Sequence, residues 1–205
     1  MNIFFRTNFN NNIGIGHIVR CSRLAEEFVK LGHKCYFYLD KFKENKLLNF
    51  NSTYLYTKET IFNEKIDSKK FIKETKKIGP GYVVVDDYRI GTKWEKFVSK
   101  FNKKIITFDD LNNKEHYSDF IINYNPINYP DVKYNYKLNT KKKCIFLIHP
   151  KYNIVSKKKI LKNHEFEKNK FYITFYLGGG GDFLFLKKIL LKLVQNKYFT
   201  KRVRF

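Results

Sequence analysis

The stretch "YVVVD", residues 82–86, decides the fold: it is an almost wholly apolar run that ends on a carboxylate. Its three consecutive valines are β-branched, and β-branched residues favour strands. A strand that is apolar on both faces is typical of a parallel sheet covered by helices on both sides. The run therefore predicts a central strand of an α/β domain.

Short apolar strands alternate with amphipathic helices on both sides of this run. That alternation predicts an α/β fold with a largely parallel, Rossmann-like sheet. The expected strands are 2–5, 34–39, 82–86, 104–110, 120–125 and 143–150, with a weaker candidate in "TYLYT" (53–57). The expected helices are about 16–31, 61–77 and 93–101.

The pattern restarts after a highly charged stretch at 157–170. There, an apolar strand, a glycine turn and a helix follow one another again. We therefore expect a domain boundary near residue 165, with a Rossmann-like domain over 1–165 and the beginning of a second domain over 166–205. About forty residues are too few for a complete α/β domain.

The chain of 205 residues is strongly basic, with a formal net charge of +22. Its basic residues are 35 lysines and only six arginines, whereas readers of base edges and of phosphates rely on arginine. Two interpretations stay open. The excess of lysine reflects an AT-biased genome, or it forms a surface for a polyanion.

The composition excludes several other classes. Cys21, Cys35 and Cys144 are widely spaced, which predicts neither a metal site nor a disulfide framework. No run of about 18 apolar residues is present, so we expect no membrane span. The N-terminus lacks the apolar core of a signal peptide, which leaves the cytoplasm as the expected location.

The first glycine turn opens the segment "IGIGHIVRCSRLAEEF", residues 13–28. Gly14 and Gly16 allow a tight turn and leave room for a ligand. His17 heads the apolar stripe of the following helix, and Arg20 is its neighbour on the helix surface. A helix N-terminus keeps histidine neutral, as a general base requires. The alternative is a histidine that only caps or packs. The stripe consists of Cys21, Leu24, Ala25, Phe28 and Leu31, with Gly32 as the expected cap.

A second glycine turn, "LGGGGD" (177–182), follows an apolar strand and opens a helix whose stripe begins at Phe183. Backbone N–H groups in such a turn can hold a phosphate, although a tight connection alone would explain it equally well. The spacing of a dinucleotide fingerprint is absent. The candidate phosphate-binding residues are Gly178, Gly179, Gly180, Gly181 and Asp182.

Two pairs of aspartates close predicted strands: Asp86 with Asp87, and Asp109 with Asp110. Because ligands bind at the carboxyl ends of parallel strands, we expect these carboxylates near His17. There they would orient the histidine, bind sugar hydroxyls or hold a metal; capping a helix is the alternative. Asp86 and Asp109 are the candidates we select. The remaining histidines, expected to be structural or exposed, are His33, His116, His149 and His164.

Five segments in order resemble the UDP-2,4-diacetamido-2,4,6-trideoxy-β-L-altropyranose hydrolases of pseudaminic acid biosynthesis. The opening "FFRTN…IGIGHIVRCSRLAEEF" is similar to their Arg after the first strand followed by G-x-G-H-x-x-R. "VVVDDYRIGTKWE" resembles their D-H-Y-G segment, and "IITFDDLNNKEHYSDFIINYNP" their F-D-D segment. "LIHPKYNIVSKKK" resembles a G-P-x-Y stretch, and "YLGGGGD" their glycine turn. The resemblance covers about residues 1–190.

This resemblance implies a glycosyltransferase-B-like enzyme, in which two Rossmann-like domains face each other and UDP lies mainly on the second. It implies hydrolysis of a UDP-sugar at the anomeric carbon, with inversion and without a metal or another cofactor. His17 would be the base for the attacking water. For such a hydrolase, the substrate-binding residues that we select are Arg6, Gly14, Gly16, Arg20, Asp86 and Asp109, and we expect UDP at Gly178–Asp182.

Some positions depart from that family, and they keep alternatives open. Asp87 stands where the family has His, and His149 where it has Gly. The chain stops shortly after the second glycine turn, so we expect a C-terminally truncated enzyme or one completed by a companion chain. A related UDP-sugar glycosyltransferase would use the same base. An inactive fragment or binding module, meeting nucleic acid by charge alone and not by sequence, is the third hypothesis.

Overall fold

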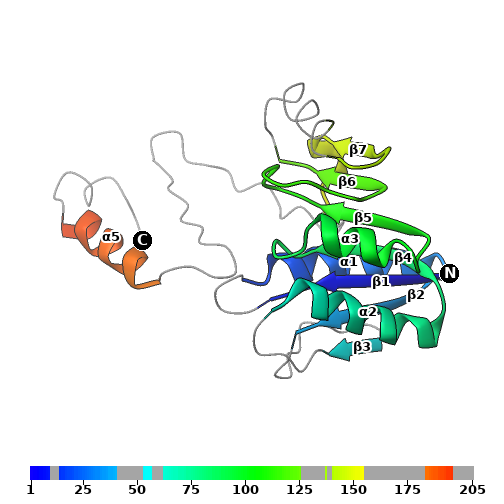
Figure 1. Ribbon diagram of the computed structural model, residues 1–205. Helices are drawn as coiled ribbons and strands as arrows, with labels where there is room; N and C mark the ends of the chain where they lie inside the picture. The colour runs from blue at the N-terminus through cyan, green and yellow to red at the C-terminus, as the bar shows by residue number, and fades with distance from the viewer. Residues whose placement is uncertain are drawn as a thin grey trace. The chain divides into compact units, whose positions relative to one another are not determined.

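The computed structural model (Figure 1) describes residues 1–9, 14–40, 53–56 (backbone only), 62–125, 137, 140–154 and 183–195. The chain divides into two compact units. The first consists of Met1–Phe9 and His17–Val155, and the second of Asn10–Gly16 and Ser156–Phe205. The expected boundary near residue 165 and the charged stretch 157–170 lie outside the described residues, so that boundary stays a prediction.

The first unit contains a seven-stranded sheet with the order β3-β2-β1-β4-β5-β6-β7. Every neighbouring pair of strands is parallel. The prediction of an α/β, Rossmann-like fold is therefore confirmed. The strands are β1 (Asn2–Thr7), β2 (Lys34–Leu39), β3 (Thr53–Tyr56), β4 (Gly81–Asp86), β5 (Lys104–Phe108), β6 (Phe120–Asn123) and β7 (Ile145–Ile148).

The order of the strands reverses once, between β1 and β4. From β1 the chain proceeds outward through β2 to β3, and then returns to place β4 on the other side of β1. In open α/β sheets, ligands bind outside the carboxyl ends of the strands at this point of reversal. Thr7, at the end of β1, pairs with Asp86, at the end of β4. These two residues mark the location of the expected site.

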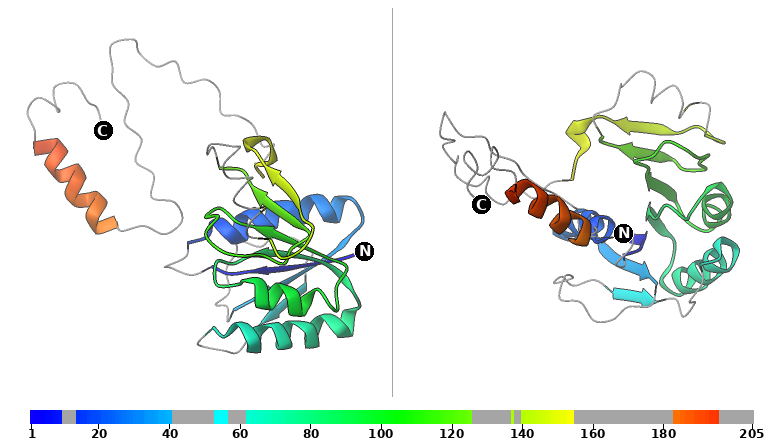
Figure 2. Two further views of the ribbon diagram at one scale, coloured as in Figure 1. Left: turned by 45° about the horizontal axis from the view of Figure 1, so that its top comes forward. Right: turned by 90° about the vertical axis from the view of Figure 1, so that its left-hand side faces the viewer.

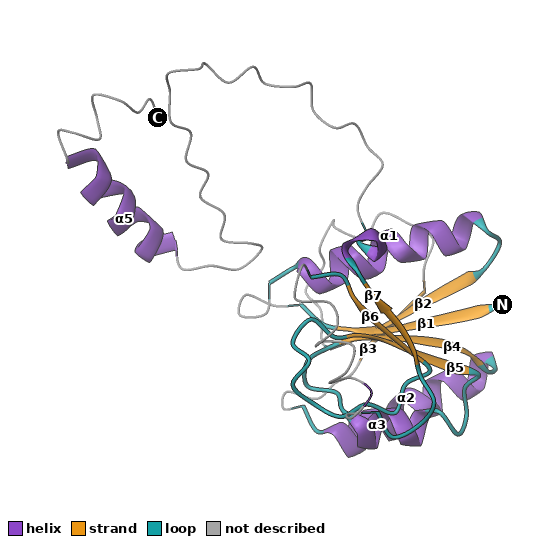
Figure 3. Ribbon diagram, turned by 90° about the horizontal axis from the view of Figure 1, so that it is seen from above, coloured by secondary structure: helices purple, strands orange, loops and turns teal. Residues whose placement is uncertain are grey.

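Helices cover both faces of the sheet. Helix α1 (Gly16–Lys30) lies on one face, and α2 (Glu64–Ile78) and α3 (Thr92–Val98) lie on the other (Figure 3). The right-hand view of Figure 2 shows the same layers, with β3 and β7 at opposite edges of the sheet. Because both faces are covered, the central strands are apolar on both sides, as the "YVVVD" run indicated.

Helix α1 buries one side and ends where the sequence predicted. Ile18, Cys21 and Ala25 are buried with His17, and Gly32 has φ of 77° in the left-handed region. The N–H of Gly32 donates to Val29 and that of His33 to Phe28, which closes the helix at its cap. The prediction was wrong for Leu31, which is 71% exposed because it lies beyond the last turn.

The two faces of β1 contact different layers. Phe4 faces α2 and α3, where it meets Phe71 edge-on, while Phe5 stacks on Phe37 at 4.7 Å beneath α1. The larger core lies on the side of α2 and α3. Its buried members are Phe4, Tyr38, Phe71, Ile72, Val83, Val85, Ile90, Trp94, Val98 and Ile105.

Gly81, the first residue of β4, packs too closely on β1 to accept a side chain. An added Cβ would lie 2.7 Å from Cε2 of Phe4 and would overlap the backbone carbonyl of Asn2. We expect Gly81→Ala to lower the free energy of unfolding by about 1–3 kcal/mol, because a strand must move. Urea unfolding measures this. Gly91→Ala is the control, since its Cβ would meet only Oε1 of Glu64, at 3.6 Å. Equal effects of both substitutions would contradict the prediction.

In the second unit, the structure describes the helix expected after the second glycine turn. It is α5 (Phe183–Gln195), and four residues of the predicted stripe are half-buried while Phe183 is exposed. Those four are Leu186, Ile189, Leu190 and Leu193. The strand and the glycine turn expected before α5 lie outside the described residues. Across the described residues, no helix has the length and apolarity needed to span a membrane.

Candidate functional site

A histidine and a carboxylate meet where the strand order reverses. His17 lies in the first turn of α1, and Asp86 is the last residue of β4. Nδ1 of His17 is 2.6 Å from Oδ1 of Asp86, and both side chains are buried. The sequence predicted both residues and their proximity. The chain brings them together because β4 ends beside β1, from which the connection to α1 departs.

The contact with Asp86 decides which ring nitrogen of His17 can accept a proton. Burial raises the pKa of Asp86, but the hydrogen bonds from His17 and Arg20 outweigh it and bring the pKa below its ordinary value. An ionised carboxylate accepts only, so Nδ1 carries the hydrogen and the lone pair of neutral His17 lies on Nε2. Nε2 has no hydrogen bond within the described part of the chain, and His17 is 8% exposed.

Arg20 holds Asp86 from the opposite side. Its Nε donates to Oδ2 of Asp86 at 2.8 Å and its Nη2 to Oδ1 at 2.6 Å, a bidentate pair. Its Nη1 donates to both carboxylate oxygens of Asp110, at 3.1 and 3.0 Å, and to the hydroxyl of Tyr124 at 2.7 Å. These contacts engage all three guanidinium nitrogens, and Nη2 also lies 3.3 Å from Nδ1 of His17, so Arg20 positions its neighbours.

Tyr88 contacts both His17 and Asp110. Its ring stands edge-on to the imidazole of His17, with centroids 4.6 Å apart. Its hydroxyl donates to Oδ2 of Asp110 at 2.9 Å, and the residue is 42% exposed. Tyr88 and Tyr124 were not predicted from the sequence, and Asp110 was expected near His17 but not selected. The one available signal was that Tyr88 and Asp110 each lie within two residues of a selected aspartate.

The structure does not bring Arg6 to His17. Arg6 is fully buried on the side of the sheet that faces α2, where Nε and Nη2 donate to both oxygens of Asp67. Nη2 also pairs with Asp40 at 2.8 Å, and Nη1 lies 3.6 Å from Asp87. Arg6 therefore neutralises internal carboxylates, although we expected it to bind substrate. Adjacent strand residues point to opposite faces, which separates Arg6 from a site beneath α1.

Asp109 lies on the wrong face as well, and Asp110 takes the place that we expected for it. Val85 pairs with Thr107, so Asp86 lies level with Phe108 and not with Asp109. The two "DD" pairs are thus offset by one residue in the sheet, and such an offset turns a side chain to the opposite face. Asp109 faces α3, where Oδ2 contacts Nε2 of His116 at 3.0 Å.

His116 forms a second buried charge cluster with Glu95 and Asp109. Its Nδ1 lies 2.9 Å from Oε1 of Glu95, and all three side chains are fully buried. Burial lowers the pKa of His116, but the hydrogen bonds to Asp109 and Glu95 prevail and raise it to about 9. His116 is therefore an imidazolium at neutral pH. We expected His116 to be structural or exposed, and the structure shows that it is a buried structural residue.

The His116 cluster predicts a stability that declines in alkali. Since the pKa of His116 rises from 6.5 to about 9 on folding, its contribution is complete below pH 6.5 and is lost as pH increases through 9. We expect the free energy of unfolding to fall by up to about 3 kcal/mol over that interval. Urea titrations at pH 6.5 and 9.5 measure the change. In His116→Gln the decline should be largely absent, and an equally steep decline there would contradict the assignment.

The two glycines of the first turn belong to the second unit. Gly14 has φ of 79°, a conformation that strains L side chains, and Gly16 is the first residue of α1. Gly14 thus needs to be glycine for its backbone alone. The five candidate phosphate-binding residues lie outside the described residues, and they are Gly178, Gly179, Gly180, Gly181 and Asp182.

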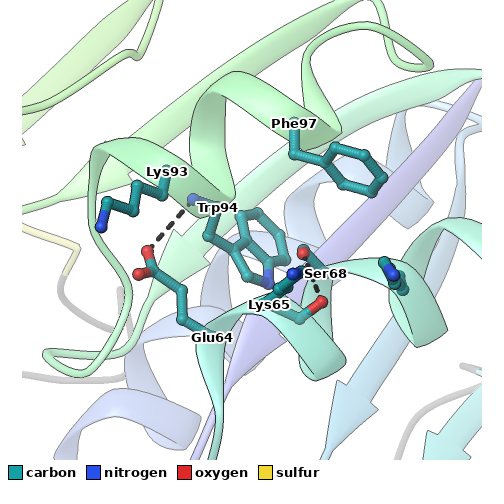
Figure 4. Close-up of a pocket in the computed structure, with 7 residues that line it drawn as sticks. Glu64, Lys65, Ser68, Lys93, Trp94 and Phe97 are labelled. Atoms are coloured by element: carbon teal, nitrogen blue, oxygen red, sulfur yellow. Dashed lines mark hydrogen bonds between the residues drawn. The ribbon is translucent and has the colours of Figure 1, made fainter.

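A small cavity lies apart from this site, between α2 and α3 (Figure 4). Its volume is about 230 Å³, and it is lined by an apolar floor with lysines at the rim. The floor includes Trp94, which has 0% exposed surface and whose indole N–H donates to Asp67. Glu64 at the rim accepts from the backbone N–H of Gly91 and Trp94, so it caps α3. None of the selected site residues lines this cavity.

The described residues hold no cluster of three or more His, Cys, Asp or Glu side chains suited to a metal ion. The fold and the site define an α/β protein with a buried Asp–His pair where the strand order of its parallel sheet reverses. No model of a known protein family matches the chain, and a comparison with curated proteins found no match. The reaction and the substrate are therefore inferred from the sequence motifs and from the geometry of His17 and Asp86.

Proposed function

We propose that this chain belongs to an enzyme that hydrolyses a UDP-activated diacetamido-trideoxy sugar to UDP and the free sugar, in pseudaminic acid biosynthesis. The observation that carries the proposal is the contact between His17 and Asp86. It fixes the hydrogen of the imidazole on Nδ1 and leaves Nε2 to accept a proton. The five sequence segments that resemble such hydrolases supply the substrate class.

The reaction follows from the acceptor at Nε2. A water molecule attacks the anomeric carbon on the face opposite the diphosphate, and Nε2 of His17 takes its proton. The bond between the anomeric carbon and the phosphate oxygen breaks, and its electron pair leaves with UDP. Asp86 stabilises the imidazolium that forms, as the carboxylate of a catalytic triad does. The free sugar is released with inverted configuration.

Arg20 has a supporting role in this proposal. It binds Asp86 and Asp110 and so keeps the carboxylate that orients His17 in one position. The resemblance implies that the leaving diphosphate binds at residues 178–182, whose glycine-rich sequence is typical of anion-binding turns. Arg6 takes no part, since its guanidinium lies among internal carboxylates.

The test is UDP release from UDP-2,4-diacetamido-2,4,6-trideoxy-β-L-altropyranose, with the free sugar followed by NMR. The proposal predicts that UDP and free sugar appear in equal amounts without any added acceptor. UDP release that requires an acceptor sugar or lipid would contradict hydrolysis and support a glycosyltransferase. Absence of turnover, together with nucleic-acid binding that weakens steeply with salt, would contradict both enzyme hypotheses. It would support a module that binds nucleic acid by charge.

A further inference from the structure

The loop after β5 connects the His116 cluster to the candidate site. It contains Asp109 and Asp110 in succession, and these two side chains point to opposite faces of the sheet. Asp109 accepts from His116, whereas Asp110 accepts from Arg20 and Tyr88. One peptide unit therefore separates a buried charge cluster from the carboxylate that holds Arg20.

The beginning of this loop is fixed by polar contacts and not by apolar packing. Leu111 is 52% exposed, and Asn112 has φ of 50°, which L residues rarely adopt. The carboxylate of Asp109 accepts from the backbone N–H of both residues, at 3.0 and 3.1 Å. The same carboxylate is tied to His116, which forms a bridge with Thr140 through its own backbone. His116 thus holds the group that shapes the loop.

We propose that His116 is a positioning residue, which, held between Glu95 and Asp109, fixes the β5 loop so that Asp110 holds Arg20 against Asp86. The inference rests on the proposed function only for its effect on turnover. Its structural part, the dependence of the Arg20 contact on His116, stands independently. His116 touches no residue of the His17 site directly, and it acts there through Asp109.

The groups that face His116 all favour its charged form. Glu95 approaches from α3 and Asp109 from the end of β5, each with one carboxylate oxygen on a ring nitrogen. Thr107 donates to the same Oε1 of Glu95 that His116 contacts, and the Tyr117 N–H donates to its Oε2. Cys144 is a titratable group that interacts with Glu95, and burial raises the pKa of its thiol to about 12, so it stays neutral where His116 titrates. His116 forms an ion pair with both Glu95 and Asp109.

The experiment compares His116→Gln with His33→Gln by following the side-chain Nε and Cζ signals of arginine in ¹³C-detected NMR. The chain has six arginines, so the spectrum is sparse. Glutamine keeps most of the volume of histidine but carries no charge, and its two N–H donors lie on one nitrogen instead of on two ring nitrogens. We expect the Arg20 signal to move in His116→Gln towards its position in urea-unfolded protein, and to stay unchanged in His33→Gln. An unchanged Arg20 signal in folded His116→Gln would overturn the proposal.

A pH titration of the unmodified protein decides the matter if His116→Gln does not fold. The Arg20 signal should then shift with the same midpoint as the ring signals of His116, near pH 9. In Glu95→Gln both midpoints should move to lower pH together, because the imidazolium loses one of its two carboxylate partners. If the Arg20 signal does not shift as His116 titrates, the positioning role of His116 is contradicted.

Turnover provides the functional readout. In His116→Gln, kcat for UDP release should fall about 10- to 100-fold while KM changes little, since misplacement near a catalytic group affects the chemical step most. A changed Arg20 signal with unchanged kcat would confine His116 to structure and overturn its role in the reaction. If the unmodified protein releases no UDP, the proposed function fails, while the NMR result still decides whether His116 controls the contact of Arg20.

Discussion

Replacing His17 by glutamine is expected to lower kcat for UDP release by about 10²- to 10⁴-fold, the usual contribution of a general base. Glutamine can still donate to Asp86, so the carboxylate keeps a partner, but it cannot take the proton of water. KM and the urea unfolding midpoint should change little. Steady-state kinetics on the UDP-sugar, with unfolding curves of both proteins, measure the two effects separately.

His33→Gln is the matched control for this substitution. His33 follows the end of α1, where its ring contacts Phe28, and it takes no part in the His17 cluster. Its replacement should leave kcat unchanged. If His17→Gln retains full turnover, then another group accepts the proton and the assignment of the base is wrong. If both variants lose activity equally, the loss arises from the fold.

Replacing Arg6 by methionine is expected to have the largest effect on stability, a loss of about 3–5 kcal/mol in the free energy of unfolding. Methionine fills part of the volume but leaves the carboxylate of Asp67 buried without the Arg6 cation, while Asp87 keeps its ion pair with Arg89 at 2.5 Å. Removal of one partner from a buried ion pair costs far more than the pair contributes in place. Urea unfolding near pH 7 measures the loss.

A control variant and a change of pH test whether the loss of stability arises from the Arg6 ion pairs. Arg23→Met is the control at the same residue type, because Arg23 makes one long hydrogen bond, 3.5 Å, to the carbonyl of Ile154. Its effect should stay below about 1 kcal/mol. Lower pH should narrow the difference in stability between Arg6→Met and the unmodified protein, since Arg89 and Arg6 hold the pKa of Asp87 below its ordinary value and protonation of that carboxylate removes its need for a cation. A loss for Arg6→Met no larger than for Arg23→Met would show that this cluster is not held by Arg6.

The fold could be predicted because its signals are local. All six strands expected from apolar runs are present within a few residues, and the weaker candidate "TYLYT" corresponds to β3. The three expected helices of the first unit are present as well. Alternation of these elements leaves few topologies for a parallel sheet, since crossovers are right-handed.

The candidate site could be predicted only in part. His17 was recognisable because a glycine turn and an apolar stripe place it at a helix start. Asp86 was recognisable because it ends an apolar strand. Both signals depend on neighbours within a few residues along the chain, and the structure places their side chains 2.6 Å apart.

The remaining partners were decided by pairings between distant parts of the chain. Arg20 contacts Asp86, Asp110 and Tyr124 across 66, 90 and 104 residues of sequence. No local pattern carries that information. The exchange of Asp110 for Asp109 shows why: identical "DD" endings lie one residue out of register in β4 and β5, and the register is set by packing of the whole sheet.

The sequence by itself therefore determined the α/β class and the order of its helices and strands. It also determined that His17 lies at the start of a helix and Asp86 at the end of a strand. These features could be predicted because hydrophobic periodicity and the residues that begin or end an element act over short distances along the chain. The tertiary structure alone decided which carboxylates reach His17 and Arg20. It also decided that Arg6 forms a buried ion pair with Asp67 and that His116 carries a buried charge. These outcomes depend on strand register and on which face a side chain meets, and a shift of one residue reverses both.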